Sequence, residues 1–224
     1  MNVLVTAGNT QTPLDQVRCI TNIFTGRTGG LIAADAFDRG HAVTVLTSHP
    51  EVFDAIPQLR LRHSPDWQIH KYRTFEDLDH LMESKITTSG FDVIIHAAAV
   101  SDYHLAGMFA PTPELPIDTT GKVKSTYPEL WLKLVPTPKL VDKIRSVWGF
   151  HGVLVKFKLE VGLTEAELLA VAERSRIQSD ADLMAANTLE GRHEWALVGN
   201  GVIGYERVLR GDLARVLLNR VEAL

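Results

Sequence analysis

Cysteine is almost absent from this chain, since Cys19 is the one cysteine among 224 residues. A single thiol excludes an intramolecular disulfide and a zinc site built from several cysteines. Because the apolar Ile20 follows it, we expect Cys19 to be a packed side chain rather than a nucleophile. So little cysteine fits a reducing compartment, and we predict a cytoplasmic location.

Excess positive charge and long apolar runs are missing as well. The formal net charge is −4 at pH 7, which provides no basic face for a nucleic-acid backbone. No apolar run approaches the roughly 20 residues of a membrane-spanning helix. The amino terminus also lacks the basic and apolar stretches of a signal peptide. We therefore expect neither a nucleic-acid partner nor a membrane partner.

The best-defined nucleotide fingerprints are not found where they would be expected. The glycine-rich stretch 25–30 matches neither G-x-G-x-x-G nor the P-loop sequence, the motifs that cradle nucleotide phosphates. None of the four tyrosines is followed four residues later by the lysine that a short-chain dehydrogenase uses. These absences argue against a flavin- or NAD(P)-dependent reductase, which stays open as an alternative.

The chain does contain a regular alternation of strands and helices. Apolar runs of strand length alternate with amphipathic stretches, which is typical of a parallel sheet with right-handed crossovers. Gly199, Asn200 and Gly201 predict a hairpin with a type I′ turn. Strands are expected at 2–6, 42–47, 69–72, 92–96, 122–124, 130–134, 153–159, 181–186, 195–198 and 202–205. Helices are expected at 31–37, 75–82, 138–147 (with Thr137 as N-cap), 165–175 (with a capping box at Thr164) and after Asp212.

The segment after the strand at 92–96 is the first candidate site. This apolar run predicts a strand buried on both faces, and ligands bind at the carboxyl ends of such strands in open α/β sheets. The alanines 97–99 let a ligand approach the backbone, and Asp102 brings the first charge. The local pattern alone favours the competing interpretation, a packed strand end with Asp102 as a helix N-cap.

Two other segments could contact a ligand. Residues 25–30 precede a predicted helix, where backbone N–H groups and hydroxyls can receive an anion. The same glycine-rich stretch also suits a simple turn. From His104 to Thr120 prolines interrupt every periodicity, so we expect a long loop with a functional role.

A set of motifs runs in order through nearly the whole chain. They are Val5–Thr10, Leu14–Arg18, Ile20–Asn22, Thr25–Gly29, Ala97–Tyr103, Lys122–Ser125, Thr137–Leu140, Phe157–Glu160 and Asp182–Asn187. Together they resemble the phosphopantothenate–cysteine ligase family, whose members are also called phosphopantothenoylcysteine synthetases. We accordingly expect an α/β fold, a Rossmann-like three-layer parallel sheet with helices on both faces, plus a carboxyl-terminal hairpin.

The resemblance implies a ligase of coenzyme A biosynthesis. Such enzymes activate the carboxylate of 4′-phosphopantothenate with CTP or ATP, and CTP is the activator expected here. The amine of L-cysteine then attacks the acyl nucleotidylate and displaces the nucleoside monophosphate. The resemblance also implies Mg²⁺ carried by the nucleotide, no metal site on the protein, and a homodimer. It implies one domain over residues 1–224 with a flexible active-site segment at about 104–121 and no fused decarboxylase domain.

The family's functional residues map onto matching positions of this chain. The resemblance implies catalytic roles for Asn22, which contacts the acyl intermediate, and for Lys122, which neutralises the phosphate under attack. Without it, Asn22 would cap a loop and Lys122 would be a solvated side chain. The implied substrate-binding residues are Arg18, Asn22, Ala98, Ala99 and Asp102. The implied nucleotide-binding residues are Gly8, Thr25, Gly26, Gly29, Ala99, Val100, Asp102, Lys122, Thr137, Pro138, Lys139, Leu140, Phe157 and Arg174.

The chain departs from the family pattern at a few positions. Asn9 stands where a second glycine is common, and Phe24 where a serine is common. Arg174 and Gln178 stand where two helix lysines reach the phosphates, so one charge is lost, and Lys156 can compensate from a position where glycine is usual. These departures leave a divergent, non-catalytic nucleotide-binding module as a second alternative.

Overall fold

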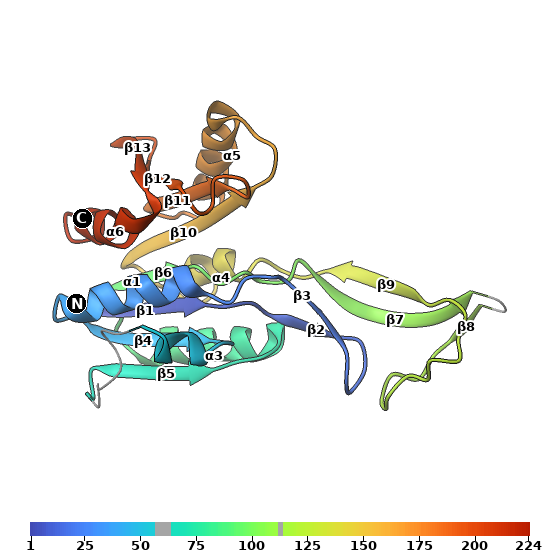
Figure 1. The fold of residues 1–224 in the computed structure, drawn as a ribbon. Helices are drawn as coiled ribbons and strands as arrows, with labels where there is room; N and C mark the ends of the chain where they lie inside the picture. The colour runs from blue at the N-terminus through green and yellow to red at the C-terminus, as the bar shows by residue number, and fades with distance from the viewer. Residues whose placement is uncertain (57–63, 112–113) are drawn as a thin grey trace.

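The computed structural model describes residues 1–56, 64–111 and 114–224. Its centre is an eight-stranded sheet with the strand order β13-β12-β11-β10-β6-β1-β4-β5 (Figure 1). The strands from β11 to β5 run parallel, whereas β12 and β13 join antiparallel at one edge. The strands are β1 (Asn2–Ala7), β4 (Ala42–Thr47), β5 (Trp67–Lys71), β6 (Val93–His96), β10 (Val153–Glu160), β11 (Leu183–Thr188), β12 (Trp195–Asn200) and β13 (Gly204–Leu209).

Helices cover both faces of this sheet, which confirms the predicted α/β architecture. Along β1 the side chains alternate, so that Val3 and Val5 lie in one core with α1 and α6 while Leu4 lies in a second core with α3 and α4. A third cluster joins α5 to the sheet. The helices are α1 (Arg27–Asp38), α2 (Glu51–Asp54), α3 (Phe75–Thr88), α4 (Leu140–Ser146), α5 (Glu165–Gln178) and α6 (Leu213–Val221), with a short 3₁₀ helix η2 (Arg210–Asp212).

The helix starts were predicted with mixed success. The capping box at Thr164 is confirmed, because its hydroxyl accepts from the Glu167 N–H and the Glu167 carboxylate accepts from the Thr164 N–H. The prediction of Thr137 as an N-cap is wrong, since α4 begins at Leu140 and Thr137 bonds elsewhere. Asp212 precedes α6 but makes no side-chain cap; its carboxylate pairs with Arg215 instead.

The carboxyl-terminal hairpin is present with a longer turn than predicted. Asn200 pairs with Gly204 across a three-residue loop, and the Asn200 Oδ1 accepts from the N–H groups of Val202 and Ile203, both at 2.9 Å. The prediction of a two-residue type I′ turn is therefore wrong. Residues 199–204 also spell G-x-G-x-x-G, but in a turn between antiparallel strands, where no helix follows to bind a phosphate.

A second, three-stranded sheet projects from the central one, and we call it the arm. It consists of β7 (Tyr103–Pro111), β8 (Glu114–Pro116) and β9 (Trp131–Pro136) in the order β8-β7-β9. The prediction of a long loop from His104 to Thr120 is therefore wrong for most of its length. Residues 112 and 113 lie outside the described residues. A register shift between Leu105 and Gly107 breaks the alternation of side chains, and this hides the strand from a pattern of period two.

Two more local differences surround the arm. The predicted strand at 122–124 is wrong: its backbone bonds to the side chains of Asp15 and Arg18 rather than to another strand. A short hairpin of β2 (Gln11–Pro13) and β3 (Cys19–Thr21) was not predicted and lies next to the base of the arm (Figure 1). Three-residue strands are too short to produce a recognisable pattern.

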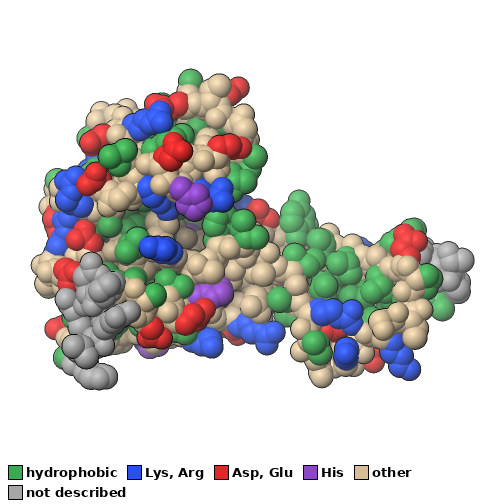
Figure 2. Space-filling model, viewed as in Figure 1, with side chains coloured by type: hydrophobic (Ala, Val, Ile, Leu, Met, Phe, Trp, Pro, Cys, Tyr) green, Lys and Arg blue, Asp and Glu red, His purple; other side chains and the backbone are tan. Residues whose placement is uncertain are grey.

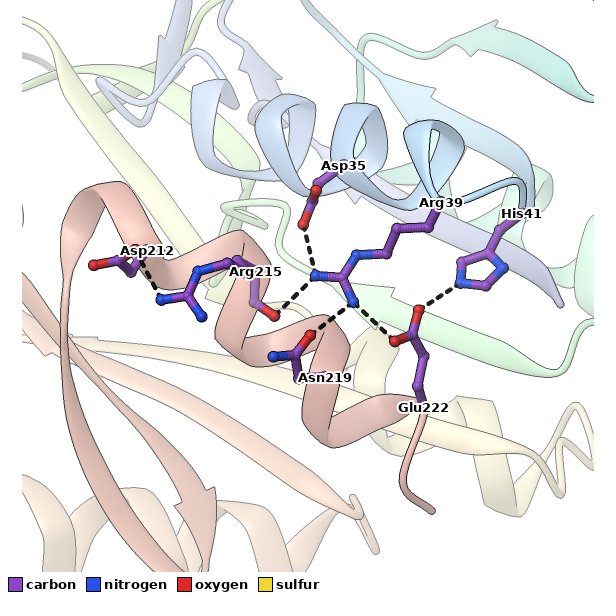
Figure 3. A network of polar contacts seen from close by, with 7 residues as sticks. All are labelled: Asp35, Arg39, His41, Asp212, Arg215, Asn219 and Glu222. Atoms are coloured by element: carbon purple, nitrogen blue, oxygen red, sulfur yellow. Dashed lines mark hydrogen bonds and ion pairs between the residues drawn. The ribbon is translucent and has the colours of Figure 1, made fainter.

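The carboxyl-terminal helix is attached to the first helix by a polar network (Figure 3). Arg39 donates to Asn219, to Glu222 and to the Arg215 carbonyl, and it also pairs with Asp35 in α1. His41 contacts the same Glu222 at 2.9 Å. Both chain ends lie at the end of the molecule opposite the arm (Figure 1). Within the described residues, no helix is long and apolar enough to cross a membrane.

Candidate functional site

The carboxyl ends of β1, β4 and β6 meet at one edge of the sheet, and the residues that follow them are tied together. The Gly8 carbonyl accepts from the Ala99 N–H at 2.8 Å, and the Asn9 N–H donates to the Ser48 hydroxyl at 2.9 Å. Gly8 has a φ of 89°, and a Cβ on it would lie 2.3 Å from the Ser48 Oγ. Glycine is therefore required where the chain leaves β1.

The glycine-rich stretch before α1 lies against this strand end. Gly26 is the helix N-cap with a φ of 85°, and a Cβ on it would lie 2.1 Å from the Gly8 nitrogen. Gly29 packs against Ala7 in the same way, and the exposed Thr25 precedes the cap. α1 begins at Arg27 rather than at the predicted Leu31, with no acidic residue in its first turn. Its free N–H groups can therefore receive an anion at this edge.

One cation beside this loop was not predicted. Arg210, in η2, donates a hydrogen bond to the hydroxyl of Thr28 in the first turn of α1. Burial lowers the pKa of this guanidinium, because the charged form has lost part of its hydration. The two residues are 182 positions apart, so no local signal in the sequence could have indicated the contact.

Asn22 and Ala99 form the centre of the candidate site. The Asn22 Nδ2 donates to the Ala99 carbonyl at 3.0 Å, and the Asn22 carbonyl accepts from the Asn9 Nδ2 at 2.6 Å. Asn9, a departure from the family pattern, thus holds the segment that presents Asn22. The Thr10 N–H also donates to Ala99, at 3.2 Å. These bonds fix a side-chain amide over the small-residue strand end.

A pocket of about 220 Å³ opens next to Asn22. Its walls come from three parts of the chain: the β2–β3 hairpin, the segment after β6 and the arm. Polar and apolar side chains both line it, which suits a ligand with both a charged and an aliphatic part. The lining residues are Thr12, Ile20, Thr21, Asn22, Ser101, Asp102, Tyr103 and Leu134.

Asp102 lies at the rim of the pocket and does not cap a helix. Its carboxylate forms an ion pair with Lys139, and its carbonyl accepts from the Thr137 N–H at 2.9 Å. The Thr137 hydroxyl donates to the Ser101 carbonyl at 2.7 Å. Three predicted site residues, Asp102, Thr137 and Lys139, are therefore brought together, and the N-cap interpretation of Asp102 is wrong because β7 follows it.

A buried lysine and a buried histidine lie side by side beneath this edge. Lys156 is paired in register with His96 on the neighbouring strand and donates to the Ser175 carbonyl at 2.8 Å and the Ser179 hydroxyl. Burial lowers the pKa of Lys156, and Asp142 opposes the effect. Burial and the Lys156 charge together lower the pKa of His96 to about 4. His96 is therefore neutral at pH 7, with its Nδ1 3.0 Å from the Thr6 hydroxyl.

Ser175 of α5 and its C-cap Ser179 face the sheet, whereas the residues predicted to reach a phosphate do not. Arg174 and Gln178 are exposed, and Gln178 bonds to Asp142 in α4. Ser175 and Ser179 are the residues that meet Lys156. The buried cation that these serines contact, Lys156, therefore comes from β10.

Arg18 and Lys122 lie together, but away from Asn22. Arg18 donates to the Val123 carbonyl, directly after Lys122, from the tip of the β2–β3 hairpin. Asn22 lies at the base of the same hairpin, on Ala99. In this single chain the two residues predicted to be catalytic are thus at opposite ends of one hairpin.

Four of the remaining predicted residues lie in or near the hydrophobic cores. Leu140 is only 1% exposed and belongs to the core with α3. Ala98 and Val100 pack against that core, Phe157 packs against the core on the other face, and Pro138 is exposed. Across 1–56, 64–111 and 114–224, no three His, Cys, Asp or Glu side chains gather closely enough to hold a metal ion.

Comparison with known proteins gives a consistent result. The profile of a family described as the DNA/pantothenate metabolism flavoprotein C-terminal domain matches residues 1–201. The coenzyme A biosynthesis bifunctional protein CoaBC of Thermococcus kodakarensis is 33% identical over 228 residues, which cover 99% of this chain and 51% of that protein. CoaBC of Escherichia coli K12 is 31% identical over 189 residues, covering 84% of this chain and 41% of that protein. The chain thus spans about half the length of these relatives or less.

Solved structures share the fold. The DNA/pantothenate metabolism flavoprotein from Streptococcus pneumoniae superposes with a TM-score of 0.83 at 27% identity, covering 100% of this chain and 99% of that one. A Cab2 mutant in complex with phosphopantothenate-cysteine superposes with a TM-score of 0.72 at 17% identity, covering 99% of this chain and 86% of that one. At that identity the second likeness concerns the fold alone.

Proposed function

We propose that this chain, which belongs to the DNA/pantothenate metabolism flavoprotein C-terminal domain family, joins 4′-phosphopantothenate to L-cysteine in coenzyme A biosynthesis. The proposed route runs through an acyl nucleotidylate formed with CTP, with ATP as the second candidate. The names of the relatives support the metabolic assignment. The residues around Asn22 support the chemistry.

The observation that carries the proposal is that the side-chain amide of Asn22 lies near the amino terminus of α1, whose free N–H groups can bind an anion. Asn22 bonds to Ala99, Ala99 bonds to Gly8, and Gly8 is in contact with the N-cap of α1. A pocket for the acyl group, lined by polar and apolar side chains, and free N–H groups for a phosphate therefore adjoin each other at the carboxyl ends of the strands. This arrangement supports a reaction between a carboxylate and a phosphate bound next to one another, and holding those two groups together is most of what the proposed reaction requires.

In the proposed first step, a carboxylate oxygen of 4′-phosphopantothenate attacks the α-phosphorus of the nucleotide. The bond from that phosphorus to the bridging oxygen breaks, and pyrophosphate leaves. Negative charge grows on the phosphate oxygens, so N–H groups at the start of α1 would stabilise the transition state, and so would the ammonium of a Lys122 brought to the site by the second copy proposed below. Side chains need not form covalent bonds here.

In the proposed second step, the amine nitrogen of cysteine attacks the acyl carbon. The bond from that carbon to the phosphate oxygen breaks, the nucleoside monophosphate leaves, and the amine loses a proton to the solvent or the phosphate. The amide of Asn22 can donate to the developing oxyanion from its place above Ala99.

We also propose that Mg²⁺ enters with the nucleotide rather than on a protein site. The carboxylate nearest to the pocket, Asp102, is already paired with Lys139. The residues present therefore suit a metal held by phosphate oxygens, where it would neutralise part of their charge.

The test is an assay of pyrophosphate release with CTP or ATP, Mg²⁺, 4′-phosphopantothenate and cysteine. We expect release with CTP and a product with the mass of the amide. Lys122→Ala should lower the rate at least tenfold, whereas Lys124→Ala, an exposed lysine two positions along, should leave it within about twofold. No pyrophosphate release with either nucleotide would overturn the proposed function.

We further propose that the chain forms a homodimer through the arm. Large apolar side chains gather on the arm (Figure 2), and Tyr103 and Trp131 are 52% and 50% exposed. An apolar patch of this kind on a small sheet usually marks an interface. The arm adjoins the pocket through Tyr103 and Leu134, so a second copy seated there would complete the pocket wall. The second copy could also bring the tip of its own β2–β3 hairpin toward the Asn22 site of the first chain. In the single chain that site has no hairpin tip next to it.

The homodimer is tested by the mass of the protein in solution, measured by light scattering. We expect the mass of two chains for the wild type and of one chain for Trp131→Glu, because a buried unpaired carboxylate is costly. A matched Val202→Glu change on the distant hairpin turn, where Val202 is 90% exposed, should leave the dimer intact. A wild type that is monomeric at micromolar concentration would contradict the proposal.

A further inference from the structure

A buried carboxylate at the tip of the β2–β3 hairpin has more partners than the turn itself needs. The Asp15 Oδ1 accepts from the N–H groups of Val17 and Arg18, both at 2.8 Å. Those two bonds close the turn. The Oδ2 accepts from the N–H of Val123, 108 positions away, at 3.0 Å, and from the Arg18 Nε at 3.1 Å. The Asp15 side chain is 1% exposed.

The same tip holds the segment 120–123 along its length. Arg18 donates to the Val123 carbonyl, and Gln16 donates its side-chain amide to the Thr120 carbonyl at 2.6 Å and its N–H to the Gly121 carbonyl at 3.4 Å. Val123 itself is 3% exposed. The backbone on both sides of Lys122 is therefore fixed to the hairpin.

The two cations at this tip are left with charge facing outward. The Arg18 side chain is 42% exposed. Its Nε and Nη2 are used on Asp15 and Val123, which leaves the Nη1 side of the fork as a donor. Lys122 is exposed. The Asp15 carboxylate is buried and hydrogen-bonded inside the turn. The exposed surface therefore carries the guanidinium of Arg18 and the ammonium of Lys122, on backbone segments that hydrogen bonds hold together.

We propose that Asp15 is a positioning residue that holds Arg18 and Lys122 as one preorganised cationic unit for the phosphate oxygens of the substrates. The inference rests on the proposed function, since it assigns Lys122 its position for that reaction. Preorganisation matters because a long cationic side chain on a loose loop would lose conformational freedom on binding, and that cost would weaken its effect.

The first test is a double-mutant cycle on the full chain. Asp15→Asn keeps the size of the side chain and removes its charge. We expect it to lower the rate of pyrophosphate release by about tenfold or more at saturating substrates. In a background that carries both Arg18→Ala and Lys122→Ala it should cause less than a twofold further loss, because Asp15 acts through these two residues. A general loss of structure would instead multiply the two defects, and that outcome overturns the proposal.

The second test needs no turnover. Asp15→Asn should increase amide hydrogen exchange at Val123 and weaken the binding of inorganic pyrophosphate, measured by calorimetry, as Arg18→Ala and Lys122→Ala also should. The matched control is Asp118→Asn, since this carboxylate of the same segment bonds to Thr120 within its own turn. Unchanged exchange or unchanged pyrophosphate binding in Asp15→Asn overturns the proposal.

The two failures can be told apart. A wild type that binds pyrophosphate but never releases it from a nucleotide overturns the proposed function, and the binding and exchange results still decide the role of Asp15. If Asp15→Asn does not fold, Gln16→Ala replaces it. That variant removes only the bond to Thr120 and should change exchange and binding in the same direction by a smaller factor.

Discussion

Asn22 is held by two hydrogen bonds, one that it donates and one that it accepts. Its side chain donates to Ala99, while its own carbonyl accepts from Asn9. An asparagine is suited to this place because one side-chain group must donate to a carbonyl without carrying charge. The residue that departs from the family pattern, Asn9, is thus one of the two groups that hold the predicted catalytic residue.

Changing Asn22 to Asp should remove the proposed activity almost completely. A carboxylate cannot donate to the Ala99 carbonyl, and its charge would repel the phosphates, so we expect a loss of about 10²-fold or more in the rate of pyrophosphate release. The control is Asn219→Asp, because the Asn219 Oδ1 accepts from Arg39 and an aspartate can do the same. Equal activity of Asn22→Asp and wild type would contradict the role given to Asn22.

Asp15 also predicts a dependence of stability on pH. Hydrogen bonds from the N–H groups of Val17, Arg18 and Val123 lower its pKa from 3.8 to about 2 in the folded chain, the bond from Val17 being the largest cause. Because the folded pKa is below the unfolded one, the carboxylate stabilises the fold above pH 4, and this contribution is lost as the pH falls toward 2.

The measurement is the melting temperature of wild type and Asp15→Asn between pH 2 and pH 7. We expect a constant difference in favour of the wild type above pH 5, which shrinks as the pH falls and nearly vanishes by about pH 2. A difference independent of pH over this interval would show that the carboxylate charge contributes nothing to stability.

At the scale of elements, α5 is attached to the edge hairpin by one charged cluster. The Tyr205 hydroxyl, on β13, donates to Glu173 at 2.6 Å, and Arg176 pairs with the same carboxylate at 2.7 Å. The Arg176 bond is the largest cause that lowers the pKa of Glu173 to about 2. The carboxylate is therefore ionised across the physiological range and accepts from both partners.

Tyr205→Phe should loosen this attachment without disturbing the sheet. A hydrogen bond to a charged group contributes about 1.5–3 kcal/mol, and the partial exposure of the cluster favours the lower end. We expect a loss of about 1.5 kcal/mol in the free energy of unfolding, measured in urea. Tyr127→Phe, at a tyrosine that is 40% exposed, is the control and should be neutral.

The elements that could be predicted from the sequence are those whose side chains repeat against one core. The apolar run at 92–96 predicted the strand β6, and the capping box at Thr164 predicted the start of α5. β7 could not be predicted because its bulge between Leu105 and Gly107 interrupts the alternation. The contacts of Asp15 with Val123 and of Arg210 with Thr28 join residues more than 100 positions apart, and no local pattern encodes such pairs.

At the scale of the molecule, one hydrophobic core includes residues from both ends of the chain. Val3 in β1 and Leu217 in α6 belong to the same cluster, and the Arg39 network adds polar contacts between α1 and α6. The last helix is therefore part of the central domain. We expect the chain to unfold in one cooperative transition.

Leu217→Ala should test this cooperativity. Leu217 is 0% exposed, and truncating a buried leucine costs about 2–5 kcal/mol. The whole transition should move to lower urea concentration, with tryptophan fluorescence and circular dichroism coinciding. Leu224→Ala, at a residue that is 64% exposed, should change little. Two separate transitions in Leu217→Ala would indicate that α6 unfolds independently.

The position of the chain ends has a practical consequence. Met1 and Leu224 are 40% and 64% exposed, and both lie at the end remote from the arm and the hairpin tip (Figure 1). A reporter dye or an affinity handle attached at either terminus would therefore stand clear of the arm surface. Immobilised by such a handle, the protein would present its arm and pocket to the surrounding solution, which is the orientation that surface-based binding measurements need.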